Sequence, residues 1–128
     1  MKKEAISTQE APQAIGPYSQ GVKANGFLFV SGQIPLDPNS GNVVGTTIEE
    51  QTEQVMRNLS AILKSQSLGF DFVVKTTVFL TSMGDFPRFN EVYSKHLKPP
   101  YPARATVEVG KLPKGVMVEI EAIVAYPQ

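Results

Sequence analysis

The sequence predicts one α+β domain in which two helices lie on one face of a β-sheet. The chain has 128 residues, a length that suits a single hydrophobic core. Val, with 14 residues, outnumbers Leu, with 8, which favours strands. Patterns typical of strands and helices follow one another in the order strands, helix, strand, helix, strands. No polar linker divides residues 1–128, so we expect a single domain.

The first strands are predicted to form a hairpin within residues 19–34. Asn25-Gly26 is typical of a type I′ turn, because both central positions of that turn need a positive φ, and apolar runs flank the pair. The second strand of the hairpin is predicted at Phe27 to Ile34. Residues 35–46 contain two Pro and two Gly, so we expect a loop there.

The first helix is predicted to follow this loop. Thr46 and Thr47 each precede a Glu by three residues, which is the pattern of a capping box. We expect Gly69 to terminate the helix. Apolar residues recur between these ends at three- and four-residue spacing, at Ile48, Val55, Met56, Leu59, Ile62 and Leu63.

A strand and a second helix are predicted next. Val73 to Leu80 is rich in β-branched residues, which favours a strand. Asp85 is predicted to cap a helix that ends before Pro99-Pro100. One side of this helix carries Phe86, Phe89, Tyr93, His96 and Leu97. We interpret His96 as a packing residue, because the chain has no Cys and no second His that could complete a transition-metal site.

The last third of the chain is predicted to form another hairpin. Ala103 to Leu112 and Val116 to Tyr126 both have the composition of strands. Pro113-Lys114-Gly115 lies between them and is typical of a turn. We therefore expect these two strands to pair with each other.

Alternation of side chains along the predicted strands separates two different faces of the sheet. The first face is aliphatic and is expected to receive the helices; it includes Leu28, Val30, Ile34, Val74, Thr76, Val78 and Leu80. The second face mixes large apolar groups with polar and charged ones: Phe27, Phe29, Phe79, Met117 and Ile123 among Ser31, Gln33, Thr77, Arg104, Thr106 and Glu119. We infer that a second subunit covers this face, because large apolar groups are rarely left together in solvent. The alternative is a solvent-facing sheet on which Arg104, Glu119 and Glu121 are ordinary exposed charges.

Composition argues against several classes of protein. The 12 basic residues are balanced by 12 acidic ones, and no basic stripe suits the phosphates of a nucleic acid. No apolar run approaches the roughly 20 residues of a membrane-spanning helix. Residues 1–10 lack the apolar segment of a secretory signal, so we expect a cytoplasmic protein. The absence of Cys excludes disulfides and thiolate catalysis.

Four segments of the chain together carry a resemblance to a known family. They are IGPYSQG (Ile15 to Gly21), SGQIP (Ser31 to Pro35), VVKTTVFLTSMGDF (Val73 to Phe86) and PARATVEVGKLPKGVMVEIEA (Pro102 to Ala122). With Asn90 and Tyr93 between the last two, the chain resembles the reactive intermediate deaminase family, RidA or YjgF, over nearly its whole length.

The resemblance implies a YjgF/chorismate-mutase-like fold, a mixed sheet with two helices, assembled as a homotrimer around a central barrel. Active sites would lie in clefts between subunits. The activity implied is hydrolysis of short enamines and imines, such as 2-aminoacrylate and 2-iminobutyrate, to 2-oxo acids and ammonium. No metal and no organic cofactor is implied. The partners implied are the small-molecule substrate and further copies of this chain, whereas composition argues against nucleic acid and membrane as partners.

The resemblance also assigns roles to individual residues. Arg104 matches the arginine that grips the substrate carboxylate, which suits the planar guanidinium; an ion pair with a neighbouring Glu is the alternative. Glu119 matches the acid that positions and activates water, with Glu121 as its alternative on the same side of the strand. Tyr18 matches a site-lining tyrosine and is predicted to be catalytic, with its hydroxyl orienting substrate or relaying a proton. The remaining matches are predicted to bind substrate: Ser31, Gly32, Phe89, Asn90 and Thr106.

Four of these matches carry a further expectation. Gly32 allows close approach of the backbone to a ligand, although an isolated glycine in a strand also marks a bulge. Phe89 and Asn90 match helix positions that face a neighbouring subunit's cleft, although Asn90 is equally suited to capping local backbone. Thr106 stands where many members of the family have a cysteine, so the thiol is not required if this chain is a deaminase.

Two rival functions follow from the same patterns. A non-catalytic trimer could bind small carboxylates in the same cleft and regulate a partner protein, because a fold alone does not settle function. Ribonuclease activity has also been attached to the family, but the balanced charge and the single His argue against it.

Overall fold

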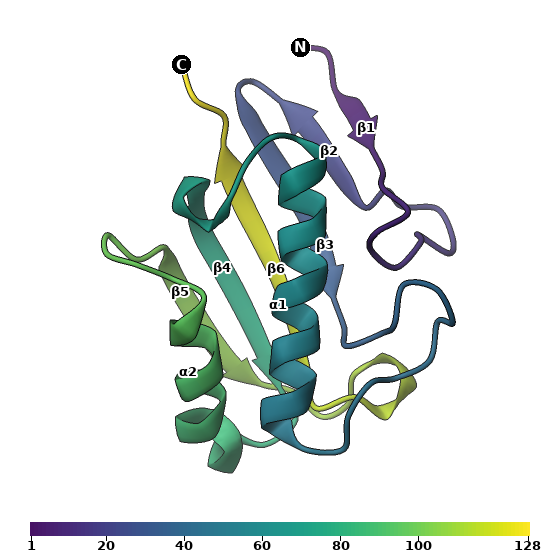
Figure 1. Cartoon of the computed structure of the whole chain (residues 1–128), viewed down its shortest axis with the longest axis vertical. Coiled ribbons are helices and arrows are strands. Elements are labelled where there is room, and N and C mark those ends of the chain that lie inside the picture. The colour runs from purple at the N-terminus through teal and green to yellow at the C-terminus, as the bar shows by residue number, and fades with distance from the viewer.

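The computed structural model describes residues 1–128 as one mixed six-stranded sheet with two helices on one of its faces (Figure 1). The strand order is β1-β2-β3-β6-β4-β5, and every neighbouring pair is antiparallel except β4 and β5. The bounds are β1 Glu4–Ile6, β2 Gly21–Ala24, β3 Phe27–Gln33, α1 Ile48–Ser65, β4 Val73–Leu80, α2 Phe86–Lys95, β5 Ala103–Glu108 and β6 Val118–Ala125. The predicted α+β class with two helices on one face is therefore confirmed.

Two short sequence motifs, the turn at Asn25-Gly26 and the helix cap at Thr47, form the structures that were predicted for them. Asn25 and Gly26 have φ values of 52° and 82° and join β2 to β3 in a hairpin, as a type I′ turn requires. At the start of α1, the Thr47 hydroxyl accepts a hydrogen bond from the Glu50 amide at 3.2 Å. The Glu50 carboxylate in turn accepts one from the Thr47 amide at 3.2 Å. The predicted capping box is thus confirmed.

The ends of the helices differ in detail from the prediction. Helix α1 ends at Ser65, several residues before Gly69. Ser67 takes the left-handed conformation, with φ 58°, and the Leu68 amide then donates to the Leu63 carbonyl at 2.9 Å. Asp85 does occupy the N-cap position of α2, but its side chain makes no capping bond and instead accepts from Arg88 at 2.8 Å.

The predicted hairpin of the last two strands is wrong. Strand β5 pairs in parallel with β4, and β6 lies between β3 and β4 in the middle of the sheet (Figure 1). Helix α2 connects β4 to β5, and such a crossover places two strands parallel and adjacent. Strand β6 alternates fully buried aliphatic residues, which suits a central strand, whereas most of β5 is exposed and suits an edge.

Two bulges change which side chains reach the core. The pairing of β3 with β6 shifts register between Val30 and Gln33, and Gln33 is buried although alternation placed it on the opposite face. The pairing of β4 with β6 shifts between Val73 and Lys75, so that Val73 is buried and Val74 is exposed. One inserted residue reverses the alternation beyond it. The glycine in β3 therefore does mark a bulge.

The two faces of the sheet differ as predicted for most strands, but not for β5. The parallel register pairs Arg104 with Thr76 and Thr106 with Val78. Thr76 and Val78 are buried beneath the helices, so Arg104 and Thr106 lie on the helix face and not on the mixed face. The mixed face retains Phe79 opposite Glu119 and Phe29 opposite Ile123.

Candidate functional site

The first group of predicted site residues lies on the helix face, where edge strand β5 meets α2. The Arg104 guanidinium donates to the Asn90 side-chain oxygen at 2.8 Å. Its central carbon lies 5.2 Å from the centre of the Phe86 ring and 5.1 Å from that of Tyr93, within the range of cation–π attraction. Asn90 thus contacts Arg104 rather than capping backbone, and the other N–H groups of the guanidinium remain free for a ligand.

The aromatic residues behind Arg104 belong to the core. Tyr93 is buried, and its hydroxyl forms a 2.7 Å hydrogen bond with that of Thr76. The Phe89 ring lies 5.2 Å from the Tyr93 ring and is fully buried. The prediction that Phe89 faces a neighbouring cleft is therefore wrong, because its position on α2 points into the protein's own core.

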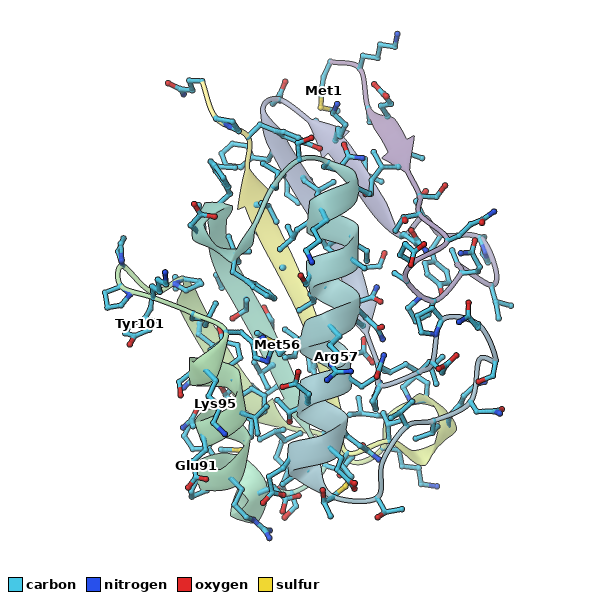
Figure 2. All side chains as sticks on the ribbon, in the orientation of Figure 1. Met1, Met56, Arg57, Glu91, Lys95 and Tyr101 are labelled. Atoms are coloured by element: carbon cyan, nitrogen blue, oxygen red, sulfur yellow. The ribbon has the colours of Figure 1, made fainter.

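A hollow of about 580 Å³ opens beside Arg104, between α2 and the segment that leads into β5. It is lined by Pro87, Asn90, Glu91, Tyr93, Ser94, Leu97, Tyr101, Pro102 and Arg104. Figure 2 shows Glu91 on α2 and Tyr101 on the loop beyond it, at the outer side of the molecule. The lining combines the Arg104 guanidinium with apolar and polar groups, including the Glu91 carboxylate, so Arg104 is the group in this hollow that suits a small organic anion.

Thr106 lies two residues beyond Arg104 on the same side of β5. Its hydroxyl oxygen is buried without a hydrogen-bond partner. A buried hydroxyl without a partner is uncommon, because its desolvation is not compensated. The substrate-binding role of Thr106 stays a prediction.

The second group lies on the mixed face, around Glu119 of β6. Burial raises the pKa of the Glu119 carboxyl, and the nearby charge of Glu121 raises it further. The carboxylate lies directly over Gly32, where a Cβ atom would overlap with it. Only glycine therefore fits beneath Glu119 without displacing the acid.

Ser31, next to Gly32, forms hydrogen bonds with the loop that precedes β2. Its amide donates to the Gln20 carbonyl at 2.9 Å, and its hydroxyl donates to the Ser19 carbonyl. Tyr18 precedes these residues, is 54% exposed, and accepts a 3.4 Å hydrogen bond from the Ile15 amide. The bulge in β3 thus places Gly32 beside Glu119, and the adjacent Ser31 bonds to the residues that follow Tyr18.

The two groups do not meet within one chain. Arg104 lies on the helix face at the edge of the sheet, whereas Glu119 lies on the opposite face of β6. Alternation along the strands had predicted both on one face, and this prediction is wrong because the register of β5 on β4 pairs Arg104 with the buried Thr76. One chain therefore carries two separate groups of predicted site residues, a cationic group around Arg104 and an acidic group around Glu119, which we name the cationic and the acidic half-site.

His96 does more than pack. Its ring lies 5.9 Å from that of Phe70, and its Nε2 atom lies 2.8 Å from the Glu53 carboxylate on α1. Burial acts to raise the pKa of Glu53, but hydrogen bonds and charges from His96 and Arg57 outweigh it and lower the pKa. No group of three or more His, Cys, Asp or Glu side chains is placed to hold a metal ion.

The sequence did not indicate that Phe86 and Tyr93 contact Arg104. The available signal was the order of strand, helix and strand from Val73 to Glu108, which is typical of a parallel crossover. A crossover would have placed α2 directly against β5. Neither α1 nor α2 combines the length and apolar character that a helix needs to cross a membrane.

Comparison with known proteins gives consistent matches over most of the chain. Residues 8–126 match the family model described as endoribonuclease L-PSP. The chain is 57% identical to a candidate regulator, AldR, of Lactococcus lactis, over 92% of this chain and 94% of that protein. It is 46% identical to the chloroplastic Reactive Intermediate Deaminase A of Arabidopsis thaliana, over 96% of this chain and 66% of that protein. The crystal structure of E. coli TdcF with bound serine matches with a TM-score of 0.90 at 41% identity, over 97% of this chain and 99% of that one.

Proposed function

Because the chain belongs to the endoribonuclease L-PSP family, which includes reactive intermediate deaminases, we propose that it hydrolyses small enamines and imines. The substrates proposed are 2-aminoacrylate and 2-iminobutyrate, and the products are 2-oxo acids and ammonium. The relative named as a deaminase and the serine bound to TdcF support a small amino-acid-like ligand.

Arg104 would bind the substrate carboxylate. Its guanidinium has free N–H groups, and a planar guanidinium can hold a carboxylate by two parallel hydrogen bonds. A hydrogen bond to a charged group contributes about 1.5–3 kcal/mol. The hollow beside Arg104 leaves room for the rest of a small substrate.

Glu119 would direct the hydrolysis. An enamine such as 2-aminoacrylate first becomes an imine by gaining a proton at its methylene carbon and losing one from nitrogen. Water then adds to the carbon of the C=N bond, the nitrogen gains protons, and the C–N bond breaks to leave an oxo acid and ammonia, which becomes ammonium. A carboxyl group with a raised pKa holds its proton closer to neutral pH, so it can orient the water and return a proton to the departing nitrogen. Glu119 is only partly buried, and the missing side chain at Gly32 leaves room for its carboxylate.

The observation that carries the proposal is the placement of Arg104 and Glu119 on opposite faces of one sheet. A substrate can touch both only if a second copy brings its acidic half-site to the cationic half-site of the first. When such contacts are head-to-tail, they repeat from copy to copy and close into a ring if the rotation between copies allows it. In line with the family resemblance, we propose a homotrimer with three sites between subunits, whose sheets enclose a central barrel and bury Phe27 and Phe29, which are 40% and 45% exposed in one chain.

The test measures ammonium release from imines generated in place by a threonine or serine dehydratase. We expect the protein to accelerate this release, and Arg104→Ala and Glu119→Gln each to abolish the acceleration. Arg57→Ala, which removes an exposed arginine on α1, is the matched control and should retain full activity. If the wild-type protein does not exceed the uncatalysed rate, the deaminase proposal is wrong.

Co-expression of the two inactive variants tests whether the site is shared. Random mixing in a head-to-tail ring pairs an intact Arg104 with an intact Glu119 at about a quarter of the interfaces. We expect about a quarter of the wild-type activity to return. Mixed assemblies as inactive as the separate variants would show that each site belongs to one chain.

A non-catalytic regulator is the second candidate. It is supported by the relative named as a candidate regulator and by the serine bound to TdcF. In that case 2-oxo acids should raise the melting temperature of the protein while ammonium release stays at the uncatalysed rate.

A further inference from the structure

We propose that Thr76 and Tyr93 are positioning residues that hold the Arg104 guanidinium ready to receive a carboxylate. The inference rests on the proposed function, since it assigns these two residues a role in presenting the arginine of that site. Neither residue needs to touch the substrate. Tyr93 acts through its ring, and Thr76 acts by fixing that ring.

The contacts of Arg104 come from one face of α2. Phe86, Asn90 and Tyr93 follow one another at spacings of four and three residues, which places their side chains together. The two rings lie 5.2 and 5.1 Å from the guanidinium carbon, and the Asn90 oxygen accepts a hydrogen bond at 2.8 Å. An arginine on an edge strand would otherwise move freely, because its side chain has many rotamers.

The Tyr93 ring is itself held in place by a hydrogen bond to Thr76 on the sheet. Its hydroxyl and that of Thr76 form a 2.7 Å hydrogen bond, and both residues are buried. Neither hydroxyl has another side-chain partner in the structure, so each would lose its hydrogen bond if the ring moved. The Phe89 ring lies 5.2 Å from the Tyr93 ring and limits its tilt.

Strands β4 and β5 place Thr76 and Arg104 next to each other in the sheet. Thr76 on β4 is the register partner of Arg104 on β5. Strand β4 therefore holds the hydroxyl of Tyr93 through Thr76, and the neighbouring strand β5 holds the backbone of Arg104, against which the Tyr93 ring lies. Lysine would not be held in the same way, because its ammonium group lacks the planar surface that stacks on aromatic rings.

Ordering Arg104 in advance should strengthen substrate binding. A side chain that is already fixed loses less conformational entropy when the ligand arrives, and restoring its freedom weakens binding by about 3- to 10-fold. We therefore expect variants that release Arg104 to raise KM, or the Kd for 2-oxobutyrate, by this factor while kcat changes little.

The experiment compares Tyr93→Leu with Tyr126→Leu in the full-length protein. Tyr126 is a matched control, because its ring also lies 5.0 Å from a cation, Lys23, and its hydroxyl also forms a hydrogen bond, with Gln66 at 2.9 Å. The order of the arginine Nε–H groups is measured by ¹⁵N NMR relaxation without any ligand. Arg57 and Arg88, the other two arginines of the chain, serve as references in the same spectrum.

We expect the Arg104 signal to be ordered in the wild type and in Tyr126→Leu, and mobile in Tyr93→Leu. The double variant Thr76→Val/Tyr93→Phe keeps the ring and removes both hydroxyls, so no buried hydroxyl of the pair is left without a partner. We expect Arg104 to be mobile in this double variant as well. The double variant therefore still tests the role of the hydroxyl pair if Tyr93→Leu does not fold. Equal order of Arg104 in the wild type and the double variant would overturn a positioning role for the hydroxyl pair.

Binding of 2-oxobutyrate separates this inference from the proposed function. If the wild type binds and the loosened variants bind about 3- to 10-fold more weakly, the positioning role is supported. Unchanged affinity in a variant with a mobile Arg104 would overturn it. If the wild type neither binds nor turns over any imine, the proposed function fails, whereas the NMR result still reports whether Thr76 and Tyr93 order the arginine.

Discussion

At the scale of single residues, Glu119 shows how packing sets the chemistry of a carboxyl group. It is half-buried over Gly32, and Glu121 lies on the same side of β6. Both conditions disfavour the charged form, so the pKa is raised above its usual value near 4.5. Folding therefore binds a proton to this group more tightly than the unfolded chain does.

This raised pKa predicts a pH-dependent gain from Glu119→Gln. Above the folded-state pKa the wild-type carboxylate is charged in both states, and its burial destabilises the fold, so the neutral amide should raise the melting temperature. The gain should shrink as the pH falls through the folded-state pKa and vanish below the unfolded pKa, where both states are protonated. Thermal unfolding of both proteins between pH 4 and pH 8 checks this, with the exposed Glu10→Gln as control. A gain that stays constant with pH would contradict the assigned cause.

At the scale of elements, the end of α1 carries a non-glycine residue in a conformation that favours glycine. Ser67 has φ 58°, and the helix ends where its neighbours bond back to Leu63 and Lys64. We expect Ser67→Gly to stabilise the protein by about 0.5–1 kcal/mol, because the left-handed conformation is strained for a residue with a Cβ atom. Ser65→Gly, two residues earlier within the helix, should destabilise it by about 0.5–1 kcal/mol. Urea unfolding measures both changes, and the same sign for the two substitutions would refute the assignment.

The elements also show which parts of the fold a sequence can predict. Asn25-Gly26 and the Thr47 capping box act through neighbouring residues, so their outcomes were predicted correctly. The strand with which β5 pairs is decided by β4 and by the path of α2 between them. Alternation of side chains along β5 alone carries no information about this pairing. The bulges at Gly32 and Val74 are likewise set by the pairing with β6. The contact between Gly32 and Glu119 and the surroundings of Arg104 both depend on pairing between segments that lie far apart in the sequence, so alternation along single strands did not predict either arrangement.

At the scale of the whole molecule, assembly should decide whether the site exists. The mixed face carries Phe27 and Phe29, whose ring centres lie 6.4 Å apart and whose side chains are partly exposed in one chain. A charge placed between two protomers without a partner is strongly unfavourable. We expect Phe29→Asp to sediment at the 13.9 kDa of a single chain and to lose all imine hydrolysis. Asn39→Asp adds the same charge on an exposed loop and should remain assembled and active. An active monomeric Phe29→Asp variant would contradict the shared site.

The crossover from β4 through α2 to β5 has a consequence for inheritance. The cationic half-site, including Arg104 and every residue that contacts its guanidinium, comes from one uninterrupted stretch between Thr76 and Arg104. The acidic half-site comes from distant parts of the chain, the segment up to Gly32 and strand β6. Exchange of that one stretch between relatives would therefore carry the proposed anion recognition with it as a cassette, and leave the proposed hydrolytic acid of the recipient untouched.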